Sequence, residues 1–450
     1  MSKNINLLEG NITSSIARLA FPLMGMSLLQ MAYNLTDIFW IGKLGAGAVA
    51  AVGTGGLLAW FAMGLHMLAQ IGGQVLVAQN LGAGDNSLAG KLAHSAIFLS
   101  ASISIFIGIT FNVFINPIIG FFNLNDTEVI VFAKTYVSVI CGFILFQLMA
   151  KLLTSLITAT GNSRVPFIAS TFGLIFNIVI DPILIFGWFG LPALGVLGAA
   201  IATVLAQIIV LLVLVLYTKR DQILFCHVKL FQKPDFSLCK KILKLSLPVS
   251  IQNTIFPLIT MYLSRLVAGF GDHAVAAQRV GSQLESISWM ATDGFAIAVN
   301  SFIAQNYGAK NLKRAREGFF KSLKIILIYG VFTSAILIFC AEPLFKIFLS
   351  DAPSLAIGID YLRIMGFSQL FLCLEILCSN SLNAFGKTLP PATISLSCMS
   401  LRVPLATIIS AGAIGLSGIW YSMAITSIAK GTIMLCAILY FLKLIKKISQ

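Results

Sequence analysis

The sequence predicts an all-α polytopic membrane protein with twelve transmembrane helices in two six-helix lobes. The first observation behind this prediction is composition: of 450 residues, 58% are hydrophobic and only 10% are charged. A soluble domain carries roughly 25% charged residues, so this chain cannot cover itself with polar surface in water. The second observation is length, since about 20 apolar residues per span leave room for about a dozen spans and short loops.

Apolar runs between polar or Gly/Pro breaks define the expected spans. Their limits are 14–41, 48–78, 92–116, 130–159, 164–188, 194–218, 241–268, 274–305, 318–341, 355–384, 391–411 and 415–442. Several runs are long enough to require tilted helices or helices that extend past the lipid core. The first run is too long for the apolar core of a signal peptide, so we expect a retained span.

Basic residues concentrate in alternate loops between the apolar runs. The formal net charge of +14 would suggest nucleic acid in a soluble protein,. Here the cations cluster in 219–240, in 310–316 and in the C-terminal tail, where they set topology and meet lipid headgroups,. We therefore expect no nucleic-acid partner and both termini in the cytoplasm.

The two halves of the chain repeat each other. The segment "VAQNLGAGD" at 77–85 recurs as "IAQNYGAKN" at 303–311, and "AVAA" at 48–51 recurs at 274–277, so both pairs have the same offset along the chain. Because each unit holds six spans, both halves enter the membrane with the same orientation, which predicts a parallel repeat about the membrane normal. The expected parts are an N-lobe (1–218), a cytoplasmic linker (219–240) and a C-lobe (241–450).

Four oxygen-bearing side chains share one depth band in the N-lobe. Asp37, in "NLTDIFWIG", lies about 6 Å from the outer end of the first span, at 1.5 Å per residue,. Asn177 and Asp181 are spaced i and i+4, so they point from one face of the fifth span,. Thr203 lies at a similar depth on the sixth span,.

Two nearby carboxylates in a low-dielectric region cannot both stay ionised cheaply, so one takes a proton or a cation binds between them. Carboxylate, amide and hydroxyl oxygens suit a hard cation such as Na⁺. Two separate acids, each capped by a hydroxyl or amide, would be the structural alternative. The repeat mates of Asp37, Asn177 and Asp181 are Leu263, Arg402 and Ala406. The acids therefore form a one-sided site that the repeat does not require.

Tyr33 and Gln30 precede Asp37 by one and two helical turns and extend its polar face,. That face lines a substrate cavity or makes hydrogen bonds between helices.

Three acids of the C-lobe are secondary candidates. Glu285 and Asp293 lie eight residues apart on one span, where an internal ion pair or a contact between lobes is favoured over transport chemistry. Glu375 is a lone acid on the tenth span, where the same structural interpretation is favoured over transport chemistry.

The sequence contains no HExxH, GxSxG, GxxxxGK[ST] or paired-cysteine motif,. We therefore expect neither an enzyme nor an ATP-driven pump, and no cofactor beyond a coupling ion.

The chain resembles the multidrug and toxic compound extrusion (MATE) transporters over essentially its whole length. The resemblance rests on "LAFPLMGMSLLQMAYNLTDIFWIGKLG" (19–45), "TGNSRVPF" (160–167), "NIVIDPILIFG" (177–187), "GVLGAAIAT" (195–203) and the two repeated segments above. It is strongest for the DinF-type branch. It implies a two-lobed exporter that works by alternating access, in which H⁺ or Na⁺ enters while an amphipathic, often cationic compound leaves.

The resemblance also implies residue roles. The coupling-cation site of that branch falls on Asp37, Asn177, Asp181 and Thr203, a bending proline on Pro22, and a tyrosine near the site on Tyr33. The C-lobe acids of the NorM-type branch are not matched, because Glu375 is displaced from the expected position.

With this resemblance, we expect a monomeric secondary-active exporter of the bacterial inner membrane. A flippase for lipid-linked oligosaccharides is the alternative within transporters, and an intramembrane enzyme is the alternative from another class.

Overall fold

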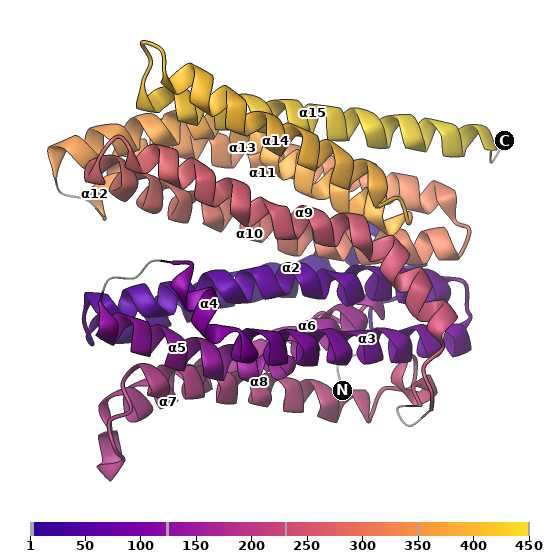
Figure 1. Cartoon of the computed structure of the whole chain (residues 1–450). Coiled ribbons are helices and arrows are strands. Elements are labelled where there is room, and N and C mark those ends of the chain that lie inside the picture. The colour runs from indigo at the N-terminus through magenta and orange to yellow at the C-terminus, as the bar shows by residue number, and fades with distance from the viewer. Residues whose placement is uncertain (1–3, 123–125, 230–231, 349–350, 449–450) are drawn as a thin grey trace. The chain divides into compact units, whose positions relative to one another are not determined.

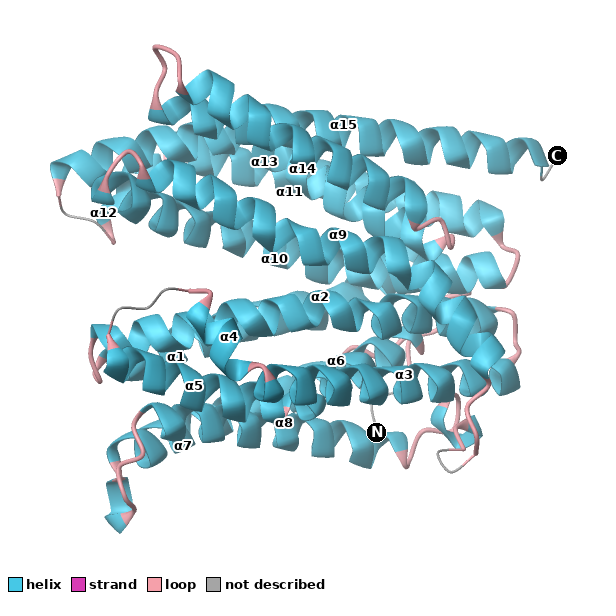
Figure 2. Cartoon of the chain, viewed as in Figure 1, coloured by secondary structure: helices cyan, strands magenta, loops and turns pink. Residues whose placement is uncertain are grey.

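The computed structural model describes residues 4–122, 126–229, 232–348 and 351–448. Within these ranges the chain forms helices and loops and no strand (Figure 2). In the part of the chain that the structure describes, eleven helices are long and apolar enough to cross a membrane, and a bent pair, α5 with α6, makes twelve if it is one span. The all-α fold with about twelve spans is therefore confirmed.

The helices follow one another with short connections (Figure 1). Their bounds are α1 Ile12–Gly42, α2 Ala46–Gly82, α3 Asn86–Val113, α4 Ile115–Gly120, α5 Thr127–Gly142, α6 Ile144–Ala159, α7 Arg164–Phe186, η1 Trp188–Gly190, α8 Val196–Thr218, η2 Phe225–His227, α9 Phe236–Ala268, α10 Asp272–Gly308, α11 Leu312–Phe339, α12 Ala341–Lys346, α13 Ala352–Ala384, α14 Leu389–Ser410 and α15 Leu416–Ile448.

The lengths and positions of the helices repeat between the two halves of the chain. Helices α2 and α10 have 37 residues each, and α3 and α11 have 28 residues each. Both bounds of α10 and of α11 follow those of α2 and α3 at the offset that the sequence predicts from its repeated segments. One span breaks the repeat: α5 and α6 meet at a 45° bend, whereas the matching α13 is one helix of 33 residues.

The starts expected at residues 92 and 318 are wrong, because α3 and α11 begin six residues earlier, at Asn86 and Leu312. The Asp85 carboxylate accepts a hydrogen bond from the Leu88 amide (2.9 Å), and the Asn311 side chain accepts one from the Arg314 amide (3.1 Å). These N-caps satisfy amides that a first helical turn leaves without partners. The polar first turns, which resemble loops in sequence, are therefore helical.

The chain folds into two compact units. The first comprises Phe21–Asn253 with the N-terminal segment up to Asn6, and the second comprises Leu7–Ala20 with the chain from Thr254 onwards. These units are defined by contacts within each of them and do not test the expected lobe limits. The limits 1–218, 219–240 and 241–450 therefore stay a prediction. Residues 230 and 231 of the expected linker, and both chain ends, lie outside the described residues.

The first unit packs α2 against α3, α5 and α6, and the N-terminal half of α9 belongs to it. The Gly72 amide donates to Ser246 Oγ (2.8 Å), and Ser250 Oγ donates to the Gly64 carbonyl (2.8 Å). A Cβ on Gly72 would come within 2.5 Å of the Ile242 carbonyl oxygen. Glycine therefore sets how closely α2 and α9 approach.

In the second unit, α13 packs against α10, α11 and α15. Tyr361 of α13 meets Trp420 of α15 edge to face, with ring centroids 4.8 Å apart. The segment Leu7–Ala20 is held by α10 and α11. Asn306 Nδ2 donates to the Leu7 carbonyl (3.0 Å), and the Arg314 guanidinium donates to the carbonyls of Leu7, Glu9 and Gly10.

We predict that Gly72→Ala destabilises the protein by about 1–3 kcal/mol, because the new methyl group overpacks against backbone that cannot move aside. Thermal unfolding of the detergent-purified protein measures this. Gly56→Ala is the matched control, since a Cβ there meets nothing within 4 Å on the same helix. Equal stability of the two variants would contradict the close contact.

Candidate cation-binding site

Helices α1, α7 and α8 meet in one apolar cluster of the first unit. Tyr33 of α1, Leu174 of α7 and Ala206 of α8 form its buried centre. The cluster fixes the neighbouring polar residues of the three helices, because a packed core allows few alternative side-chain positions.

Asn177 and Asp181 lie one turn apart on α7, and their side chains are 0% and 1% exposed. Asn177 Nδ2 donates a hydrogen bond of 3.0 Å to Asp181 Oδ1. Pro182 follows within the helix and has no amide hydrogen, so one carbonyl a turn earlier lacks its usual donor,. The local chain thus gathers oxygen atoms at one level of α7.

Asp37 of α1 joins this pair. Its half-buried side chain lies close enough to Asp181, Asn177 and Thr203 for their polar atoms to act on its charge. Tyr33, one turn earlier, lies beside Thr203. The structure therefore brings together the four side chains that the sequence places in one depth band, and their role in coupling stays a prediction.

Four buried oxygens of this cluster have no hydrogen-bond partner among the described residues: Tyr33 Oη, Asp37 Oδ1, Asn177 Oδ1 and Asp181 Oδ2. Each buried, unpartnered polar atom costs about 1–3 kcal/mol. A proton on a carboxylate, or a hard cation among the oxygens, would offset that cost. Carboxylate, amide and hydroxyl oxygens are the ligands that such cations prefer, so this donor set fits Na⁺ as well as H⁺.

Tyr136 of α5 is a member of the cluster that sequence reasoning missed. Its side chain is 7% exposed and lies within electrostatic reach of both Asp37 and Asp181. A Cβ on Gly55 of α2 would approach the Tyr136 ring to 2.5 Å, so the missing side chain at Gly55 makes room for the ring. The sequence signal was a tyrosine within an expected span, and spacing along the chain did not reveal its partners on other helices.

The remaining expected residues of α1, Gln30 and Pro22, lie closer to the N-terminal end of that helix. Gln30 Nε2 donates to Asn34 Oδ1 (3.4 Å) on an exposed part of the helix. Pro22 lies inside α1, two residues after the position where the helix passes from the second compact unit to the first.

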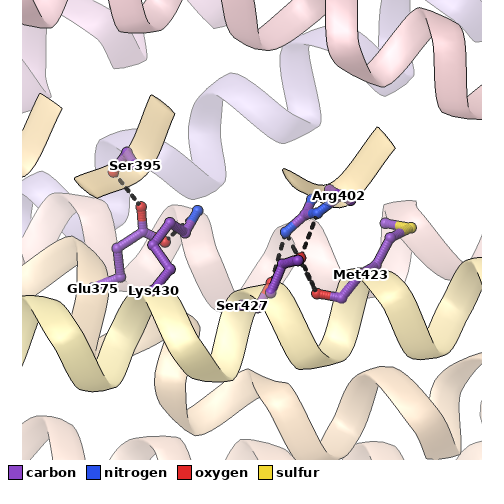
Figure 3. Close-up of polar contacts among 7 residues, drawn as sticks. Glu375, Ser395, Arg402, Met423, Ser427 and Lys430 are labelled. Atoms are coloured by element: carbon purple, nitrogen blue, oxygen red, sulfur yellow. Dashed lines mark hydrogen bonds and ion pairs between the residues drawn. The ribbon is translucent and has the colours of Figure 1, made fainter. Parts of the chain in front are cut away.

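In the second unit the buried acid Glu375 has a basic partner. Lys430 Nζ of α15 lies 2.7 Å from a Glu375 oxygen, and the two side chains are 6% and 9% exposed. Ser395 Oγ donates a further bond of 3.2 Å to Glu375 (Figure 3). The favoured interpretation of Glu375, an internal ion pair, is therefore confirmed. Its partner lies on a helix far along the chain, so within its own span the sequence shows only a lone acid.

Arg402 of α14 is also buried and fully engaged. Its Nε donates to Thr426 (2.8 Å), and another guanidinium nitrogen donates to Ser427 (2.9 Å) and to the Met423 carbonyl (3.4 Å) (Figure 3). Glu285 lies near Arg402 and Tyr361. Asp293 lies two turns further along α10 and is half-buried.

The family model described as MatE matches residues 22–183 and 248–408 of the chain. The chain belongs to the MatE family. It is 30% identical over 443 residues to a Thermotoga maritima protein named "Probable multidrug resistance protein NorM", covering 96% of this chain and 92% of that one. It is 25% identical over 445 residues to a Shewanella oneidensis protein named "FAD transporter", covering 96% and 95%.

A MOP superfamily transporter from Pyrococcus furiosus shares the fold of this MatE protein, with a TM-score of 0.91, 22% identity and 99% coverage of both chains. The family resemblance noted in the sequence is confirmed. The MatE protein is thus a multi-pass membrane transporter of small molecules and not an enzyme.

We predict that Glu375→Gln lowers the stability of the MatE protein by about 3–5 kcal/mol, because it leaves Lys430 charged and unpaired in the interior. The double variant Glu375→Gln with Lys430→Met should recover most of that loss in thermal unfolding. If both stability and transport return in the double variant, the pair is structural. A double variant as unstable as the single one would contradict this account.

Proposed function

We propose that this protein is a secondary-active exporter. It couples the entry of H⁺ or Na⁺ to the expulsion of amphipathic, often cationic organic compounds by alternating access. Its membership of the MatE family and the oxygen cluster around Asp37 and Asp181 support this proposal.

The observation that carries the proposal is the lack of a cationic partner for two acids. Neither Asp37 nor Asp181 makes an ion pair with any Lys, Arg or His of the described ranges, whereas Glu375 is paired with Lys430. An intramembrane acid costs at least about 2.5 kcal/mol on insertion scales, so it marks function by default. A transported cation is the natural partner for such a pair.

In the proposed cycle, a cation neutralises the acid pair and α1 bends near Pro22. The bend narrows the N-lobe cavity, which Tyr33 and Gln30 border, and substrate leaves. Proline removes one intrahelical hydrogen bond and so weakens the helix at that point. The change of compact unit just before Pro22 supports a hinge there.

The bacterial origin of the relatives supports a bacterial inner membrane location, and the basic loops favour both termini in the cytoplasm,. We further propose that the protein acts as a monomer, with the lobes 1–218 and 241–450 joined by the linker 219–240.

We predict that Asp37→Asn and Asp181→Asn retain substrate binding but lose gradient-driven export by more than tenfold. The amides keep the shape of the side chains and remove the charge that a cation neutralises. The measurement is counterflow and efflux in proteoliposomes, with a proton or a sodium gradient imposed one at a time and at several pH values.

Asp272→Asn is the matched control, because Asp272 is an exposed acid in the first turn of α10. Wild-type efflux by both site variants would end the proposal. If Glu285→Gln lost export while Asp37→Asn exported normally, the coupling site would have to lie in the second unit.

We predict that Pro22→Ala slows gradient-driven efflux several-fold while leaving cation binding unchanged, because alanine restores the missing hydrogen bond and stiffens α1. Pro404→Ala makes the same chemical change inside α14 of the second unit and serves as control. Efflux at the wild-type rate in Pro22→Ala, or equal losses in both variants, would argue against a hinge at Pro22.

The relative named "FAD transporter" makes flavin dinucleotide a second candidate substrate, and it belongs in the same counterflow assay. The flippase alternative is less well supported, since that class usually has more spans than the eleven to twelve found here.

A further inference from the structure

A basic cavity of about 810 Å³ lies in the second unit, where α10 turns into α11 beside the C-terminal end of α15. It is lined by Lys310, Asn311, Leu312, Lys313, Arg316, Glu317, Phe320, Lys321, Leu442 and Ile445. Four of these residues are cations and one is an acid. The cavity is separate from the acid cluster of the first unit, so its role does not depend on the proposed transport cycle.

One of the four cations occupies a strained backbone position. Lys310 has φ +57°, in the left-handed region, and the matching position of the α2–α3 turn is Gly84, with φ +79°. A side chain in this region costs about 1–2 kcal/mol, and glycine avoids the cost. Since Gly84 makes the same turn without strain, a lysine at Lys310 points to a use for its side chain.

The repeat shows that the fold does not need these cations. At the offset of the repeat, the mates of Lys310, Lys313, Arg316 and Lys321 are Gly84, Ser87, Gly90 and Ser95. All four mates are small and uncharged, although α3 and α11 have the same length and matching N-caps. The positive charge is therefore an addition of the second unit.

The charge of the cavity is not neutralised within the protein. None of the four cations forms an ion pair with an acid of the described residues, Glu317 included. The contrast is Arg314 on the same helix, whose guanidinium is used to hold the segment Leu7–Ala20 through three backbone carbonyls. The cavity therefore presents positive charge that attracts an anion.

Apart from Asn311 and Glu317, the rest of the lining is apolar. Leu442 and Ile445 come from α15, and the Arg316 guanidinium lies over the Phe320 ring, 5.5 Å from its centroid. The candidate spans α10 and α11 join at this turn, so the cavity lies at one end of both membrane-crossing helices. Basic charge beside an apolar wall at this level matches a lipid that has an anionic headgroup and acyl chains.

We propose that this cavity binds an anionic phospholipid, with its phosphate among Lys310, Lys313 and Arg316 and an acyl chain along Leu442 and Ile445. Arginine and lysine side chains recognise phosphate through charge-assisted hydrogen bonds. A bound lipid would tie the α10–α11 turn to the end of α15.

The test is lipid binding to the full-length, detergent-purified protein, measured by native mass spectrometry and by thermal unfolding. The probes are phosphatidylglycerol, phosphatidylcholine of the same chain length, and inorganic phosphate. Phosphatidylglycerol should bind and raise the unfolding temperature, and phosphatidylcholine should do so less. A juxtamembrane cation is worth about fivefold in affinity, so Lys313→Gln with Arg316→Gln should weaken phosphatidylglycerol binding more than tenfold.

Lys310→Gly separates the ligand role from a structural one. The glycine removes the strain, so stability without lipid should be unchanged or higher, while phosphatidylglycerol binding falls about fivefold. Lys240→Gln, which removes an exposed cation of α9 outside the cavity, should bind as wild type. Equal loss in Lys240→Gln, no loss in Lys310→Gly, or the full thermal shift with inorganic phosphate alone would overturn the proposal.

Discussion

A charge inside a helix bundle that lies in lipid must have a partner, and this constraint shapes both units. In the second unit Glu375 has Lys430, and Arg402 is surrounded by hydroxyl and carbonyl oxygens. Glu285 makes no ion pair among the described residues but lies near Arg402. In the first unit Asp37 and Asp181 have only each other, an amide and a hydroxyl. The proposed coupling depends on this difference, since only an incomplete site has something to gain from an ion in transit.

The internal repeat shows where the two halves differ in charge. Arg402 occupies the position that Asn177 holds in the first half of the chain, so a guanidinium fixed to α14 stands where the first half presents an amide oxygen. A tethered cation cannot leave, and its field disfavours a second cation nearby. The two halves therefore share a backbone plan while one keeps a permanent charge and the other keeps acids without a basic partner.

Much of the architecture and part of the candidate site were predictable from sequence. Depth along a helix adds at about 1.5 Å per residue, so Asp37, Asn177, Asp181 and Thr203 could be placed at one level before their helices were seen. Neighbours across helices do not follow from depth, because they depend on how each helix is rotated and packed. For that reason Tyr136 was missed and Lys430 was not identified as the partner of Glu375.

The attachment of Leu7–Ala20 to the second unit bears on how the chain is made. This segment leaves the ribosome first, yet its backbone carbonyls are bonded by Asn306 and Arg314, which are synthesised much later, in the second half of the chain. The beginning of α1 must therefore wait, inserted but undocked, until α10 and α11 exist. Maturation of the first half cannot finish before the second, so the two halves fold as one interdependent product even though each is compact.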